Sequence, residues 1–437
     1  MTSQTTIETL SNEILLYIFS HLSWPDLLTS LWSLNICFNS LVCSTLSVNS
    51  NLLNTGLVFT LGSSYNKLHS TLFPLLLNSS SLSSCIQRIH FDERNSIVRD
   101  CVYQWLFNDK EIIFPNLKSL ILTQCRLKEP LIESLVYLIE RQLDELILSF
   151  AKDNFMVPDC VRQDSPLVID EKKQTSMMKQ LFGLLFSGQC QLKSLQLDIN
   201  NHFLNKDIHH CLTSHYDRSM DRCFTLRHLD VRMACTCLLE NLIERVPNLE
   251  RLSVHFQSSL NFDSLWKTNP DRLEQSNENW FNKASEELGA NTLSTVRYVE
   301  FSLPSCHNSS KREIHMCKQL VPFLKQYMPY LQTLHIWRPD DFPWTSIRPD
   351  YGKKKDDSGR FTYRWLKSLR TSESISRHTI VFKQDLCQLV KNLKELTFLD
   401  IHGEIDHEKV ESYRLMAQRR FPNSRIDFDL SRFRLWL

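Results

Sequence analysis

The sequence predicts an α/β protein in which short parallel strands alternate with outer helices, behind a short segment of three helices at the N-terminus. Three observations lead to this fold class. A Leu-x-x-Leu-x-Leu phrase recurs along the chain, helical patterns with apolar stripes lie between the phrases, and three short amphipathic stretches fill the first fifty residues. At 437 residues the chain is long enough for two unequal units.

The first helix is indicated by apolar residues at helical spacing. They are Leu10, Ile14, Leu15, Ile18, Phe19 and Leu22. Ser11 is expected to cap this helix by accepting a backbone N–H, and Glu13 suits the positive end of the helix dipole.

A second helix is expected from Ser23-Trp24-Pro25-Asp26, which combines a capping residue with a proline in the first turn. Leu27, Leu28, Leu31 and Leu34 continue its apolar stripe, and a third apolar patch follows at Phe38, Leu41 and Val42. Three short helices bury little surface alone, so they either cap a larger domain or bind a partner.

The order of residues in this stretch resembles the F-box family, whose pattern runs Leu-Pro-x-Glu-Ile/Leu, two residues, Ile-Phe-Ser, a Leu, and then Asp-Leu-Leu. The matches are Leu10, Glu13, Ile14, Ile18, Phe19, Ser20, Leu22, Asp26, Leu27 and Leu28. Ser11 replaces the family's proline, and Asn35 to Phe38 depart from the pattern of the third helix. The resemblance covers about a tenth of the chain and implies docking on a Skp1-like adaptor, which links to cullin and RING subunits. The docking residues it implies are Leu10, Ser11, Glu13, Ile14, Ile18, Phe19, Leu22, Asp26, Leu27, Leu28 and Leu31.

The recurring phrase indicates a repeat with one short strand in each unit. The nine phrases begin at Ile86, Leu117, Leu143, Leu192, Leu226, Leu249, Val296, Leu331 and Leu396. Their last two apolar positions alternate as in a strand, while the first is expected to turn the chain out of the preceding helix. Helices are expected at 131–141, 177–186, 237–245, 314–327 and 410–420. Ile426, Phe428 and Leu430 alternate as a final strand that closes the repeat.

Strand, helix, strand, helix with irregular spacing resembles the irregular leucine-rich repeats that follow many F-boxes, an open solenoid. The expected organisation is an F-box at 1–50, linking helices at 51–84 and a repeat domain at 85–437. Two polar insertions, at about 152–175 and 338–360, are expected to be long loops. Whether they border a binding site stays open.

Composition argues against several classes of function. The net charge is +1, so nucleic acid is not an expected partner, and eight glycines leave no phosphate-binding loop. The chain has no basic leader and no apolar run long enough for a membrane span, so we expect a cytoplasmic or nuclear protein that does not enter membranes. No catalytic elbow or zincin motif occurs, since His407-Glu408-Lys409-Val410-Glu411 lacks the second histidine. We therefore expect no catalytic residues, no metal site and no cofactor.

The resemblance predicts a non-catalytic substrate-recognition subunit of an SCF-type ubiquitin ligase, acting in ubiquitin-dependent protein degradation. A protein cargo is expected on the exposed strand positions. These are Ser119, Ile121, Glu145, Ile147, Ser194, Gln196, His228, Asp230, Arg251, Ser253, Thr333 and His335. Two alternatives stay open: a leucine-rich-repeat binding scaffold that recruits no ligase, and an enzyme in which a cysteine pairs with a distant histidine.

Overall fold

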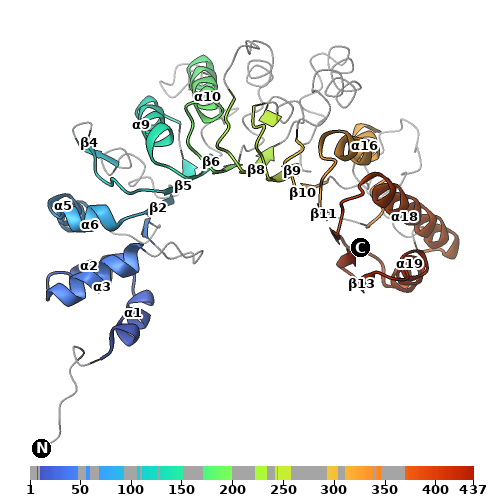
Figure 1. The fold of residues 1–437 in the computed structure, drawn as a ribbon, viewed down its shortest axis with the longest axis horizontal. Coiled ribbons are helices and arrows are strands. Elements are labelled where there is room, and N and C mark those ends of the chain that lie inside the picture. Colours follow the sequence, from blue (N-terminus) through green and yellow to red (C-terminus); the bar gives the residue numbers. More distant parts are fainter. Residues whose placement is uncertain are drawn as a thin grey trace, which may run out of the picture. The chain divides into compact units, whose positions relative to one another are not determined.

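The computed structural model divides the chain into two compact units, Met1–Cys211 and Leu212–Leu437. Figure 1 draws its helices and strands. It describes residues 7, 10–47, 56–59, 68–92, 106–108, 111–125, 127–150, 171–198, 222–233, 242–243, 245–256, 293–303, 311–338, 341–345 and 370–437. Each unit is described by itself. No helix among these residues is both long and apolar enough to cross a membrane.

Three short helices open the first unit: α1 (Asn12–Ser20), α2 (Trp24–Ser30) and α3 (Ile36–Ser47). The hydroxyl of Ser23 accepts the N–H of Asp26, as expected for the start of α2. Ser11 takes the N-cap position of α1, but its side chain makes no capping bond, so the predicted serine cap is wrong there. Helix α3 does have a side-chain cap, because the side-chain oxygen of Asn35 accepts the N–H of Phe38 at 2.8 Å.

The first unit contains a five-stranded parallel sheet in the order β1-β2-β5-β6-β7. Its strands are β1 (Leu57–Phe59), β2 (Arg88–Asp92), β5 (Ser119–Cys125), β6 (Glu145–Phe150) and β7 (Ser194–Asp198). Its other elements are η2 (Leu68–Leu72), α5 (Phe73–Asn78), α6 (Ser80–Cys85), the hairpin of β3 (Phe107–Asn108) and β4 (Glu111–Ile112), α9 (Glu129–Arg141) and α10 (Glu171–Leu185). Helices α9 and α10 lie side by side along one side of the strands (Figure 1).

The second unit contains seven strands in the order β8-β9-β10-β11-β12-β14-β13. They are β8 (His228–Met233), β9 (Arg251–Phe256), β10 (Tyr298–Ser302), β11 (Thr333–Trp337), β12 (Phe398–His402), β13 (Arg425–Phe428) and β14 (Arg432–Trp436). Its helices include α16 (Lys311–Tyr327), α18 (Ser372–Asn392) and α19 (His407–Arg420). The strands are parallel up to β12, and β14 and β13 are antiparallel. The single closing strand that we predicted is thus an antiparallel pair, because the chain turns at 429–431 and β14, not β13, pairs with β12.

The leucine phrases repeat one local structure. At Leu117, Leu249, Val296, Leu331 and Leu396, the first apolar residue of the phrase donates its N–H to the carbonyl three residues earlier, at 3.1–3.3 Å. The residue before each strand then accepts two N–H groups from the start of the next strand, as the carbonyl of Lys118 does from Asp144 and Glu145. The expected turn into the strand is confirmed, and it keeps neighbouring strands in one register.

That register aligns the buried side chains of successive strands. In the first unit Leu120, Leu146 and Leu195 pair in sequence, and in the second Leu252, Val299 and Leu334 do the same. All of them are at most 1% exposed. The mixed α/β class with mostly parallel strands is therefore confirmed.

Most predicted helices are present. The helices expected at 131–141, 177–186, 314–327 and 410–420 correspond to α9, α10, α16 and α19, whereas 237–245 lies largely outside the described residues. Strand β1 falls in the stretch 51–84 that we expected to be only helical, and α18 was not predicted.

The two predicted insertions lie mostly outside the described residues. Residues 171–175 of the first belong to α10. The described part of the second, 341–345, has no regular secondary structure, but Phe342 and Trp344 are buried in it. That part is core and not a solvated loop. The domain boundaries predicted near residues 50 and 84 remain predictions.

A buried charge cluster ties this segment to the last helices. Asp341 forms an ion pair with Lys409 of α19 and accepts a hydrogen bond from Tyr413 at 3.0 Å. His378 Nδ1 of α18 lies 3.2 Å from the same carboxylate. Burial alone would raise the pKa of Asp341, but His378 and Lys409 outweigh it and lower that pKa to about 2.

We expect Asp341→Asn to lower the free energy of unfolding by about 3–5 kcal/mol, because it leaves the ammonium of Lys409 buried without its counter-charge. The double variant with Lys409→Met should lose less, since it removes both charges. Urea denaturation of the three proteins measures this. A loss below about 1 kcal/mol in Asp341→Asn would show that the pair does not stabilise the fold.

Asp385 of α18 provides a pH-dependent test. Burial raises its pKa to about 6, although Thr345 donates hydrogen bonds that favour the ionised form. The carboxyl therefore favours folding while it is protonated, and this contribution is lost as pH rises from about 4 through 6. The stability of Asp385→Asn relative to the wild type should improve by on the order of 1 kcal/mol between pH 5 and pH 7.5. Exposed Glu404→Gln is the control, and an equal improvement there would contradict the assignment to Asp385.

Candidate functional site

One side of the N-terminal helices is fixed to the edge of the first sheet. The indole N–H of Trp24 donates to the carbonyl of Val58 on β1 at 2.8 Å. Its ring lies 5.1 Å from that of Phe59, which in turn stacks on Phe91 of β2 at 4.6 Å. Helix α2 is thus anchored to an edge strand that would otherwise present an unpaired backbone.

The three helices also share a small core of their own. Phe19 of α1 meets Phe38 of α3 edge to face, with ring centroids 5.9 Å apart. Leu27 and Leu28 of α2 are buried as well. Phe19, Leu27 and Leu28, all predicted docking residues, therefore hold the helices together, and their side chains are buried.

Several large apolar side chains of the same helices are exposed. Ile14 and Leu22, both predicted docking residues, are exposed. Tyr17 is 69% exposed and Ile36 is 89% exposed, and Leu34 is exposed too. We call Ile14, Tyr17, Leu22, Leu34 and Ile36 the apolar face of the helices. So many exposed large apolar side chains on a small unit indicate an interaction surface.

The remaining predicted docking residues surround this face. Ser11, Glu13 and Asp26 are exposed, and Leu10, Ile18 and Leu31 are half-buried. A backbone hydrogen bond at the start of α1 lowers the pKa of Glu13, with a smaller contribution from the Ser11 hydroxyl. The rim of the apolar face is therefore polar and carries negative charge.

Each sheet has a second face, opposite the buried leucines, which we call the open face. In the first unit it carries the predicted positions Ser119, Glu145 and Ser194 in one row and Ile121, Ile147 and Gln196 in the next. Ser119 and Ile121 are only 3% and 6% exposed, so their predicted exposure is wrong, whereas the positions on β6 and β7 are partly accessible. The Ser119 hydroxyl donates to the Glu145 carboxylate at 2.5 Å.

The second unit carries the other six predicted positions in register. His228, Arg251 and Thr333 share one row, while Asp230, Ser253 and His335 share the next. The predicted exposure of Ser253 is wrong, because this side chain is buried and its hydroxyl lies 3.1 Å from Nε2 of His255. The structure adds side chains that we did not predict: Tyr298 and Glu300 on β10, Phe398, Asp400 and His402 on β12, Trp337 on β11, and Arg432, Arg434 and Trp436 on β14. The phrases at Val296 and Leu396 could have identified those on β10 and β12, since the same alternation applies there.

Aromatic rings run across the open face of the second unit. The guanidinium of Arg251 lies 4.1 Å from the ring centroid of Tyr298. His335 lies 5.0 Å from Tyr298 and 5.6 Å from Phe398, and Phe398 lies 5.1 Å from Trp436. Such a row offers flat apolar surfaces with hydrogen-bonding edges, which suits a polypeptide partner.

Acidic groups alternate with these rings. The Tyr298 hydroxyl donates to Glu300 at 3.0 Å; burial and that carboxylate raise the pKa of Tyr298. Asp230 lies 3.8 Å from His255, and burial raises its pKa. The open face of the second unit thus presents both signs of charge close together.

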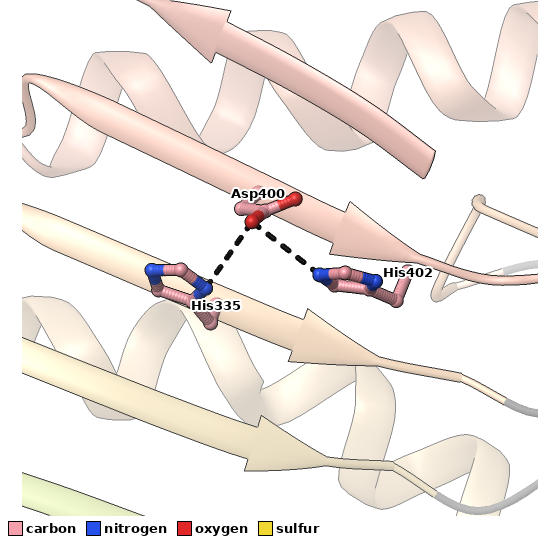
Figure 2. Close-up of side chains that lie close together, drawn as sticks. All are labelled: His335, Asp400 and His402. Atoms are coloured by element: carbon pink, nitrogen blue, oxygen red, sulfur yellow. Dashed lines mark ion pairs between the residues drawn. The ribbon is translucent and has the colours of Figure 1, made fainter. Parts of the chain in front are cut away.

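Asp400 is the most enclosed of these acids, with a side chain that is 0% exposed. Arg432 donates to both of its carboxylate oxygens, at 2.9 Å and 2.6 Å. His335 and His402 approach one of these oxygens from either side (Figure 2). Burial would raise the pKa of Asp400, but the hydrogen bonds from His335 and Arg432 hold it far below its usual range. Burial lowers the pKa of His402.

These three side chains are the one group within the described ranges that has metal-ligand chemistry and mutual proximity. It was not predicted, because His335 is 65 residues before Asp400 in the chain and only the strand pairing joins them. The sequence also contains two isolated pairs, Cys235-x-Cys237 and His209-His210, which lie outside the described residues. Within the near-zincin stretch, His407 and Glu408 are exposed at the start of α19, while Lys409 is the buried partner of Asp341.

No family model matches the chain, and no curated protein matches it.

Proposed function

We propose that the chain is a substrate-recruiting adaptor of an SCF-type ubiquitin ligase. In this proposal the N-terminal helices are an F-box that binds a Skp1-like adaptor and, through it, the cullin and RING subunits. The following units form an irregular leucine-rich-repeat solenoid whose open face binds a protein cargo. The protein would act in the cytosol or nucleus.

The apolar face of the helices carries this proposal. Phe19, Leu27 and Leu28 satisfy the internal core and Trp24 anchors α2 to the sheet. Within the part of the chain that the structure describes, the five side chains of the apolar face stay exposed while these two requirements are met. Burial of such a face against a partner stabilises the complex by roughly 25 cal/mol for each Å² removed from water.

The mechanism would be proximity. A chain with these two surfaces needs no bond chemistry of its own, because it raises the local concentration of a cargo lysine near the charged conjugating enzyme. Cargo would meet the aromatic and charged side chains of the open face, where exposed Arg251 lies over half-buried Tyr298 and exposed Trp337 stacks on His402.

The second candidate is a binding scaffold that recruits no ligase. The contacts of Trp24 with Val58 and Phe59 support it, since capping an edge strand would by itself explain why the helices are there. The two candidates differ in whether the outward side of the helices binds anything.

Capture of a purified Skp1-like adaptor by the full-length chain separates the candidates. We expect Ile14→Asp with Leu22→Asp to weaken binding at least tenfold, because each charge falls within an apolar contact. Both side chains are exposed, so the fold should be retained. Exposed Ile380→Asp on α18 is the matched control and should bind like the wild type. Failure of the wild-type chain to bind would leave the scaffold as the function.

A cargo bound at the open face should respond to a different pair of substitutions. Proximity labelling in cells with the Ile14→Asp, Leu22→Asp variant should enrich proteins that are degraded when the wild-type chain is present. Adding Arg251→Ala and Trp337→Ala should remove that enrichment, whereas adding the exposed control Phe224→Ala should not. Equal labelling in all three variants would place the cargo site elsewhere.

A further inference from the structure

Two imidazoles and one carboxylate meet on the open face of β11 and β12 (Figure 2). His335 and Asp400 are partners in the register of the two strands, and His402 follows Asp400 by two positions on the same face. His335 Nδ1 lies 3.3 Å from Oδ2 of Asp400, and His402 Nε2 lies 3.4 Å from the same oxygen. The three potential ligand atoms all lie within 4.8 Å of one another.

These separations are long for charge-assisted hydrogen bonds, and they also match the spacing of ligands around an ion. A charge-assisted hydrogen bond spans about 2.7–2.9 Å, the range that Arg432 Nε reaches at 2.9 Å from Oδ1. Ligand atoms placed tetrahedrally at about 2.0–2.1 Å from zinc lie about 3.3 Å apart. Both histidine–carboxylate separations match the second value.

The surroundings hold the three side chains in place. The ring of His402 stacks on Trp337 with centroids 3.7 Å apart and an angle of 9° between the planes. His335 lies between Tyr298 and Phe398. Arg432 holds both carboxylate oxygens, Oδ1 through Nε at 2.9 Å and Oδ2 through Nη2 at 2.6 Å, so the carboxylate keeps its orientation beside the imidazoles. Partners of this kind orient metal ligands and restrict their rotation before an ion binds.

We propose that His335, Asp400 and His402 bind a divalent ion of the zinc class, with a fourth position left to solvent or to a donor from a bound protein. Two imidazoles and a carboxylate suit zinc, and the histidine side chains are 19% and 18% exposed, which leaves an approach from outside. The guanidinium of Arg432 offsets part of the carboxylate charge, so we expect weaker binding than at a closed four-ligand site. Metal binding is independent of the adaptor proposal; only a role in holding cargo rests on it.

Zinc titration of the untagged, metal-stripped full-length chain by isothermal calorimetry tests the site. The variants His335→Phe and His402→Phe keep a ring in each stacked position and remove the donor nitrogen. Each should lose one equivalent of zinc or bind it at least tenfold more weakly than the wild type. His255→Phe on β9, also on the open face, is the matched control and should bind as the wild type does.

Cobalt provides the second measurement. The wild type loaded with Co²⁺ should show the visible absorption of a tetrahedral nitrogen and oxygen site, and both phenylalanine variants should lose it while their circular dichroism stays unchanged. Zinc and cobalt binding that is equal in the wild type and both variants would overturn the proposal, because any ion would then be held elsewhere. Absence of binding by the wild type would overturn it as well.

Discussion

The in-register stacking of apolar side chains on neighbouring strands is the constraint on which the rest of the structure depends. Leu252, Val299 and Leu334 pair directly across β9, β10 and β11, and all are buried. Because side chains alternate along a strand, fixing this row on the core side fixes every intervening side chain on the open face. A slip of one residue would bury the charged row and expose the apolar one. The same packing that stabilises each sheet therefore sets the geometry of its candidate binding surface.

Two edge strands of the sheets, β1 in the first unit and β13 in the second, have different neighbours. Edge β1 is covered by α2, through the indole of Trp24 and the ring of Phe59. At the C-terminal end, β14 pairs antiparallel with β12 and is followed by β13. An unprotected edge would present free backbone groups to other chains. Helix α2 contacts β1 through Trp24. The side chains of the apolar face take no part in this contact and stay exposed, which supports the proposed docking function.

Two buried carboxylates of the second unit are each surrounded by cationic or hydrogen-bonding side chains. Asp341 is surrounded by Lys409, His378 and Tyr413, and Asp400 by Arg432 and two histidines. A buried charge without partners would be costly, so such clusters specify one arrangement of the elements that contribute to them. The first cluster joins α18, α19 and the segment before them, with Asp341 and Lys409 buried and His378 13% exposed. The second reaches the open face, where its histidines remain partly exposed, and this difference makes it a candidate ligand site.

Residue periodicity alone predicts the mixed α/β class, the strands begun by the leucine phrases, four of the helices between them and the apolar strand positions that face the core. These depend on residues close together in the chain, whose alternation and caps have local causes. Tertiary structure decided what depends on distant residues. Strand pairing brings His335 next to Asp400. Packing buries Lys409 and the segment around Trp344 in the core. It also divides the predicted docking residues into buried Phe19, Leu27 and Leu28 and exposed Ile14 and Leu22. Helical spacing places a side chain on a stripe, but only the packed neighbours decide which edge of that stripe stays open.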